Sequence, residues 1–267
     1  MCFCDDIVVR RETRENREKR IDKLAEKNSI YSCLISSISD GKKLLAVLVD
    51  PDKMVIENVS GFIKKVNQSI ATHIFVGGST VNINATEILV LEIKKHTKLP
   101  IILFPGDVSQ ITNHADALLF LSLISGDNTE YLIGKHIKAV SKLRGSKLEV
   151  IPTGYLLIEN GRPTSVEKVT QTKPMSTSSV QNIIDTAKAG ELLGMKLVYL
   201  EAGSGALQPV PLEIISFVKR ELNIPLIVGG GIRTKQQLEN AYNSGADLVV
   251  IGTAFEDDEA FFDDLRN

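Results

Sequence analysis

The sequence predicts an α/β protein of the (β/α)8 TIM-barrel class. Three observations favour this fold: short apolar runs of strand length alternate with helical patterns, eight such runs occur, and the last two are each followed by a glycine-bearing turn. Alternation of this kind is typical of βαβ units and a parallel sheet. Eight units close naturally into a barrel. A doubly wound open sheet is the alternative architecture.

Composition is that of one globular domain. The chain has 267 residues, 43% hydrophobic and 24% charged, with a net charge of -2, and barrels of about 250 residues commonly form single domains. The charge gives no reason to expect nucleic acid as a partner. No apolar stretch is long enough to span a membrane. Three cysteines without metal-site spacing indicate reduced thiols, so we expect a cytoplasmic protein.

The N-terminal segment differs from the rest. Residues 1–30 are expected to form a charged extension, because Arg10 to Lys27 interleaves acidic and basic residues at helical spacing. We place the barrel domain at residues 31–267. An amphipathic pattern over Tyr31 to Ile38 predicts a helix that closes the barrel floor before the first strand.

The expected strands are continuous apolar runs, typical of strands buried on both faces. They are Leu44–Val49, His73–Val76, Ile101–Phe104, Ala117–Leu121, Leu148–Leu157, Lys196–Leu200, Pro225–Val228 and Leu248–Ile251. The helical patterns between them include Val55–Gln68, Ala85–His96, Thr129–Leu143, Val180–Leu193, Leu212–Leu222 and Lys235–Ser244. The longest non-periodic stretch, Glu159–Thr177, is expected to be a loop, either a lid or a mobile surface loop.

Chemistry in such barrels comes from the carboxyl ends of strands. Asp50 leaves the first strand, and a carboxylate there is a candidate ligand for Mg2+; a turn role is the alternative. For Asp52 we expect the N-cap of the following helix. Gly77–Thr80 follows the second strand, where the glycines admit a ligand and the hydroxyls reach a metal or phosphate. A tight turn would use the same residues.

The sixth strand ends in the segment Tyr199–Ala206. Glu201 offers a base or a hydroxyl acceptor, while Gly203-Ser204-Gly205 can surround an anion with backbone N–H groups. A buried salt bridge is the alternative role for Glu201. The four histidines show no ligand spacing, which indicates structural or surface roles.

The last two strands are followed by Gly229–Gly231 and by Gly252-Thr253. A single glycine after a strand is more often a tight turn than a site. Two such turns in consecutive units favour a phosphate site, because backbone N–H groups and a helix N-terminus face an anion there.

These motifs occur in the order found in geranylgeranylglyceryl phosphate synthases, and the chain resembles that family from about Gly41 onward. The most specific elements are Tyr199–Gly205 and the Asp50 turn. The others are Gly77–Thr80, Phe104–Gly106, Ser109–Ala115, Leu121–Gly126, Gly229–Gly231 and Gly252-Thr253. Leu48 departs from some bacterial relatives, which carry a lysine there.

The resemblance implies a prenyltransferase. It would move a geranylgeranyl or similar prenyl group from its diphosphate to the C3 hydroxyl of sn-glycerol 1-phosphate, forming an ether and releasing diphosphate. Asp50 and Ser79 match the Mg2+-binding positions. The glycerol phosphate site is matched by Tyr199, Leu200, Glu201, Ala202, Gly203, Ser204, Gly205, Gly230, Gly231, Gly252 and Thr253. A homo-oligomer without a transmembrane segment is also implied, with peripheral membrane contact for the lipid product.

Two residues carry further hypotheses. We expect Glu201 to orient or deprotonate the glycerol hydroxyl. In the family the prenyl tail runs along an apolar groove, and Tyr131 resembles the bulky stop that sets its length. A simple core or capping contact is the alternative for Tyr131.

Two other functions are compatible with parts of the pattern. A sugar-phosphate isomerase or epimerase would explain the glycine turns, but it needs neither the apolar strip Leu118–Ile124 nor Asp50 as a metal ligand. A non-catalytic phosphate-binding protein would not need Asp50 and Glu201 together with both glycine turns.

Overall fold

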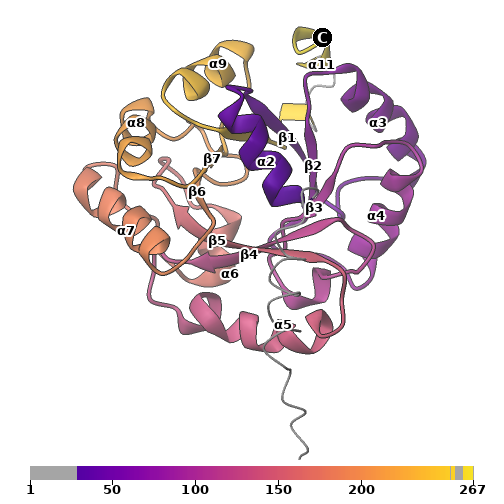
Figure 1. Ribbon diagram of the computed structural model, residues 1–267, viewed down its shortest axis with the longest axis horizontal. Helices are drawn as coiled ribbons and strands as arrows, with labels where there is room; N and C mark the ends of the chain where they lie inside the picture. Colours follow the sequence, from indigo (N-terminus) through magenta and orange to yellow (C-terminus); the bar gives the residue numbers. More distant parts are fainter. Residues whose placement is uncertain (1–28, 253, 256–260, 267) are drawn as a thin grey trace, which may run out of the picture.

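The strands of the protein form one closed parallel barrel (Figure 1). The computed structural model describes residues 29–252, 254–255 and 261–266, so residues 1–28 of the predicted N-terminal extension and Thr253 lie outside the described residues. The strands pair in chain order, and β1 (Leu44–Val49) also pairs with β8 (Leu248–Ile251) to close the ring. The barrel prediction is therefore confirmed, and the open-sheet alternative is wrong.

The other strands lie within two residues of the predicted bounds. They are β2 (His73–Val76), β3 (Ile101–Leu103), β4 (Ala117–Leu123), β5 (Glu149–Leu157), β6 (Leu197–Glu201) and β7 (Leu226–Gly229). Such short apolar runs suit strands that are covered on both faces.

Helices surround the barrel (Figure 1). They are η1 (Ile56–Asn58), α3 (Val59–Gln68), α4 (Ala85–Lys94), η2 (Val108–Gln110), η3 (Glu130–Gly134), α5 (Lys135–Leu143), α6 (Ser165–Thr170), α7 (Val180–Leu192), α8 (Leu212–Glu221), α9 (Lys235–Asn243) and α11 (Phe261–Asp264). Three differ from expectation. The first predicted helix is split into η1 and α3, and the Thr129–Leu143 pattern begins with a π-helix, η3. The stretch predicted to be only a loop contains α6, which Thr164 caps through its hydroxyl.

Side chains of each strand alternate between two apolar layers. One layer lies between sheet and helices and includes Leu200 and Ala202. The other fills the barrel and includes Tyr155 and Tyr199, which are register partners on β5 and β6. Since Glu201 is two residues after Tyr199, it points to the same side, toward the barrel axis.

The predicted floor helix is present as α2 (Ile30–Ser39), which crosses the barrel in Figure 1. Its backbone N–H groups at Ile30 and Tyr31 donate to the Glu149 carboxylate at 2.6 and 3.2 Å. A carboxylate at a helix N-terminus satisfies orphan donors and complements the helix dipole. Leu34 is buried among the barrel-filling residues. This end of the barrel is thereby closed.

None of the helices in the described ranges is long and apolar enough to cross a bilayer.

Candidate active site

A polar cavity opens at the carboxyl ends of the strands, where it was expected. The predicted site residues that line it are Asp50, Ser79, Tyr199, Glu201, Gly203, Ser204, Gly205, Gly230, Gly231 and Gly252. Leu200 and Ala202 do not line it, because they face the layer between sheet and helices. Thr253 is not among the described residues. The structure thus brings together side chains from β1, β2, β6, β7 and β8 at one mouth.

Glu201 is the central carboxylate of this cavity. It is only 6% exposed, and burial raises its pKa to about 7 because the charged form loses solvation. The Gly203 N–H donates to Oε1 at 2.6 Å and opposes this rise. The hydroxyl groups of Tyr199 and Tyr155 act in the same direction as Gly203. A carboxylate that exchanges protons near neutrality suits a general base. No described cation pairs with it, so the salt-bridge alternative is not favoured.

Two tyrosines form the inner wall beside Glu201. Their rings lie 5.3 Å apart between centroids, and the Phe104 ring stacks on Tyr199 at 5.2 Å. The Tyr199 hydroxyl is buried near the Glu201 carboxylate, yet no described residue gives it a hydrogen bond of ordinary geometry. Gly229 makes this position possible, since a Cβ there would lie 2.1 Å from that hydroxyl. A buried hydroxyl without a protein partner is a candidate ligand contact.

The glycine turns approach one another closely. Gly230 and Gly231 have φ of +85° and +72°, and Gly203 and Gly205 have φ of +100° and +71°. A Cβ on Gly230 would lie 2.5 Å from Glu201 Oε1 and 2.7 Å from the Gly203 nitrogen. Both the backbone conformation and the space therefore require glycine at 230.

Asp50 and Ser79 line the cavity from β1 and β2. Asp50 Oδ1 accepts from the Asp52 N–H at 3.0 Å, and a Cβ on Gly78 would lie 3.0 Å from the same oxygen. Within the described ranges no cluster of three His, Cys, Asp or Glu side chains could hold a metal. One carboxylate and one hydroxyl beside an open cavity nevertheless fit Mg2+, which commonly takes one or two carboxylates and completes its shell with water and phosphate oxygens.

Asp52 does not cap the following helix. Neither η1 nor α3 has a side-chain cap, and Asp52 Oδ1 instead accepts from the backbone and side-chain amides of Asn82, both at 3.0 Å. The capping prediction was wrong because a contact with the next βα loop competes successfully for this carboxylate.

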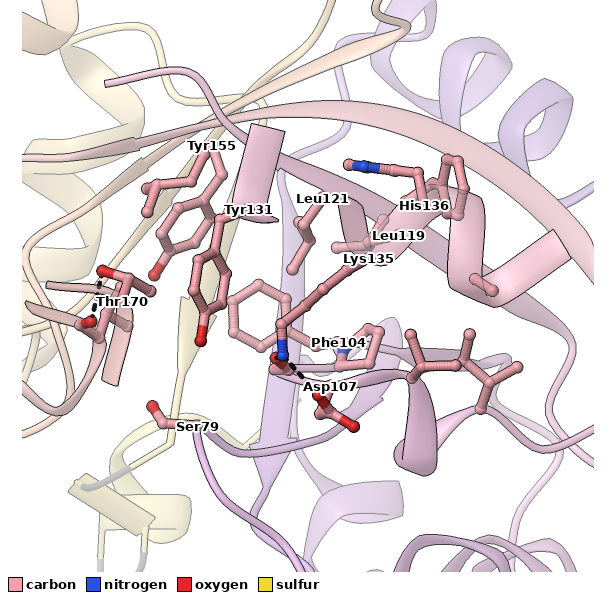
Figure 2. A pocket seen from close by; sticks show the side chains of 18 of the residues that line it. Ser79, Phe104, Asp107, Leu119, Leu121, Tyr131, Lys135, His136, Tyr155 and Thr170 are labelled. Atoms are coloured by element: carbon pink, nitrogen blue, oxygen red, sulfur yellow. Dashed lines mark hydrogen bonds and ion pairs between the residues drawn. The ribbon is translucent and has the colours of Figure 1, made fainter. Parts of the chain in front are cut away.

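An apolar groove continues from the polar cavity. Only η2, a short 3-10 helix, lies between β3 and β4, and residues of β4, η3 and α5 line the groove. In Figure 2, Phe104 and Tyr155 meet Leu119 and Leu121 in this groove, with Ser79 at one end. The residues shared by groove and cavity are Gly78, Ser79, Phe104, Tyr155, Val166 and Val169. Cavity and groove are therefore adjoining parts of one site.

Tyr131 stands in the groove wall, on the π-helix η3. Its hydroxyl donates to the Val169 carbonyl at 3.3 Å, and the Lys135 ammonium lies 4.7 Å from its ring centroid. Lys135 also forms an ion pair with Asp107 across the groove, and this pair lowers the pKa of the Asp107 carboxyl to about 2 against the effect of its burial. The ring of Tyr131 is thus held in place from two sides.

Four groove residues were missed by sequence reasoning: Tyr155, Lys135, Asp107 and His136. His136 was assigned a structural or surface role; it is buried, and its imidazole contacts the Phe120 ring edge-on and hydrogen-bonds Ser122 at 3.2 Å. The signal for Tyr155 was an aromatic residue at an inward position of β5. The Lys135–Asp107 pair joins two elements and has no local signal.

The comparisons with known proteins agree with this geometry. The chain is 57% identical over 230 residues to a geranylgeranylglyceryl phosphate synthase of Zunongwangia profunda, covering 86% of this chain and 98% of that protein. It is 53% identical over 235 residues to the Flavobacterium johnsoniae enzyme of the same name, covering 88% and 97%. The crystal structure of (S)-3-O-geranylgeranylglyceryl phosphate synthase from Thermoplasma acidophilum with sn-glycerol-1-phosphate superposes with a TM-score of 0.83 at 31% identity, covering 89% and 96%.

Residues 39–266 match the PcrB family. A match over nearly the whole barrel, together with relatives above 50% identity that are covered almost completely, leaves one conclusion: the chain belongs to the PcrB family, with the geranylgeranylglyceryl phosphate synthases.

Proposed function

We propose that this chain is a prenyltransferase that moves a geranylgeranyl or similar prenyl group from its diphosphate to the C3 hydroxyl of sn-glycerol 1-phosphate. The observation that carries the proposal is a polar cavity with a buried carboxylate that opens directly into an apolar groove. A sugar-phosphate isomerase has no use for such a groove, since its substrate lacks an apolar tail.

The acceptor occupies the polar cavity. Its phosphate lies against the turns Gly203–Gly205 and Gly230-Gly231, where backbone N–H groups bind an anion without a bulky side chain in the way. The complex named for the Thermoplasma acidophilum relative contains this same acceptor. Its hydroxyl end then extends toward Glu201 and the neighbouring Tyr199 hydroxyl, which has no hydrogen bond of ordinary geometry with a described residue.

The prenyl tail of the donor occupies the groove. Its diphosphate lies at the shared rim, which is formed by the residues common to groove and cavity, such as Ser79 and Tyr155. Asp50 and Ser79 would hold Mg2+ at this rim, and a bound Mg2+ neutralises charge that develops on a departing diphosphate. The tail packs on the apolar wall, and each buried methylene contributes about 0.8 kcal/mol. We keep Tyr131 as the stop that limits tail length.

Glu201 performs the proton transfer. Its carboxylate takes the proton from the acceptor C3 hydroxyl while that oxygen forms a bond to C1 of the prenyl group. The bond between C1 and the diphosphate oxygen breaks, and its electron pair leaves with the diphosphate. The ether product then carries its phosphate head in the cavity and its tail in the groove.

Association with other molecules is part of the proposal. Ile133, Ile137 and Val140 expose apolar side chains on one face of η3 and α5, with exposed fractions of 55%, 66% and 47%. An exposed apolar stripe supports either a homo-oligomer contact or peripheral contact with a membrane that receives the lipid product.

The test is incubation of the purified protein with radiolabelled glycerol phosphate and a ladder of prenyl diphosphates, with Mg2+ or with a chelator. We expect organic-extractable product only when acceptor, donor and Mg2+ are all present. Isomerisation of a sugar phosphate without any extractable product would contradict the proposal.

A further inference from the structure

The loop after β5 packs directly on the acceptor's anion-binding turn. A Cβ on Gly203 would lie 2.2 Å from Thr164 Cγ2, and a Cβ on Gly205 would lie 2.4 Å from Arg162 Nη2. Asn160, at the start of the same loop, donates from its side-chain amide to the Ala202 carbonyl. The contacts of Asn160 and Thr164 hold the loop against residues 202 and 203, and Arg162 lies between these two positions in sequence, with its guanidinium beside Gly205.

The Arg162 guanidinium is held there without a protein partner. No carboxylate of the described residues lies within ion-pair distance, and the guanidinium donates no hydrogen bond to them. An arginine that only stabilised the loop would be expected to bond to a carbonyl or a carboxylate. The group instead lies exposed, in van der Waals contact with Gly205.

The turn itself has free donors beside this guanidinium. The Gly203 N–H is already used by Glu201, and the Ala206 N–H is used by the Gly203 carbonyl. The N–H groups of Ser204 and Gly205 have no acceptor among the described residues. Two backbone donors without a described acceptor and a planar guanidinium thus lie near one another at Gly205, a combination suited to a phosphate, which arginine binds through two parallel hydrogen bonds.

We propose that Arg162 is a binding residue for the acceptor phosphate and adds positive charge beside the Gly203–Gly205 turn. The inference rests on the proposed function. Lys168 and Arg233 line the cavity without an ion pair to any described residue, whereas Arg162 is not among the lining residues but adjoins Gly205, which is. We therefore expect Arg162 to contribute to the preference of the enzyme for a phosphorylated acceptor over plain glycerol.

The experiment compares Arg162→Gln and Arg162→Lys with wild type, using glycerol phosphate and glycerol as acceptors at saturating donor. Because a hydrogen bond to a charged group contributes about 1.5–3 kcal/mol, we expect Arg162→Gln to raise KM for glycerol phosphate about tenfold or more, with little change in kcat. Arg162→Lys restores part of the loss. Turnover of glycerol stays at the wild-type value, since that acceptor has no phosphate.

Arg144→Gln is the matched control, because Arg144 is an exposed arginine at the end of α5, far along the chain from the glycine turns, and has no ion pair with a described residue. An unchanged KM for glycerol phosphate in Arg162→Gln would overturn the proposal. An equal loss of activity with both acceptors would also overturn it, because Arg162 would then act by packing the loop. Calorimetric titration with glycerol phosphate alone distinguishes a failure of this inference from a failure of the proposed function. Weakened binding in Arg162→Gln supports the inference even if no prenyl donor is turned over, an outcome that would contradict the proposed function alone.

Discussion

Glu201 combines two properties that pull in opposite directions, deep burial and the need to carry charge. Its pKa is raised to about 7 by lost solvation, while Gly203 and two tyrosine hydroxyl groups hold it below the value that burial alone would produce. The folded protein therefore binds this proton more tightly than the unfolded chain does. Stability contributed by Glu201 is fully present below its unfolded pKa and declines as the pH rises through about 7.

We predict from this that kcat/KM rises as the pH increases through about 7, since the proposed proton acceptor is the Glu201 carboxylate. Glu201→Gln should retain the fold and bind glycerol phosphate but form almost no ether, because an amide cannot take the proton. A pH–rate profile and an acceptor titration measure the two effects. Near-wild-type turnover of Glu201→Gln would remove the carboxylate from the mechanism.

For Asp50 we predict a loss that depends on metal. Asp50→Asn keeps an oxygen for the Asp52 N–H bond, so the turn survives. An amide is a poorer Mg2+ ligand, and turnover should fall by several orders of magnitude with glycerol phosphate affinity nearly intact. Turnover measured against Mg2+ concentration should show a higher half-saturation point. Lost acceptor binding with unchanged metal dependence would assign Asp50 to the acceptor instead.

Single positions also show where sequence reasoning stops. The strand-end motifs of Asp50, Glu201 and the glycine turns are local, and all of those within the described residues reach one cavity. To predict Tyr155 as a site residue, one would have to know the pairing of β5 with β6, which places Tyr155 beside Tyr199. To predict the role of Asp52, one would have to know of its hydrogen bond with Asn82, thirty positions away along the chain.

At the scale of elements, the turn after β7 is constrained by its neighbours as well as by its backbone. Gly230→Val should raise KM for glycerol phosphate, because the side chain would meet Glu201 and the Gly203 nitrogen. Gly194→Val is the control: Gly194 also has a positive φ, +92°, but nothing lies within 4 Å of its Cβ position. Saturation kinetics on both variants separate backbone strain from obstruction. Equal kinetics in the two would mean that the turn is outside the phosphate site.

The π-helix η3 leads to the prediction on tail length. Tyr131→Ala removes a ring from the groove wall, and extra space favours additional buried methylenes at about 0.8 kcal/mol each. The ratio of kcat/KM for a seven-unit over a four-unit prenyl diphosphate should rise. Tyr131→Phe, which loses only the hydrogen bond to Val169, should leave the ratio unchanged. A flat ratio in a folded Tyr131→Ala variant would place the stop elsewhere.

Among the elements, α6 could not be predicted from the sequence. It has six residues and no apolar periodicity, and its position depends on the hydroxyl cap from Thr164 and on the contacts of its end with Asn128 and Tyr131. Periodicity detects long amphipathic segments such as α3 and α8, whereas a short helix that is held by tertiary contacts leaves no such pattern.

For the whole molecule, the order of strands and their burial were accessible from the sequence because each βα unit repeats the same local pattern. The groove was expected only from the family resemblance, since it is lined by residues of β4, η3, α5 and α6 that no single local pattern brings together.

The shared rim of cavity and groove has a consequence for turnover. Before reaction the two substrates bind as separate molecules, each held by one pocket. Forming the ether links head and tail covalently, so the product gains from both pockets at once, as a bivalent ligand does. The floor is closed by α2, and the product must therefore leave through the mouth where it was made. We therefore expect departure of the finished lipid, rather than bond formation, to be the slow step of the cycle, and a bilayer near the mouth that accepts the tail to accelerate it.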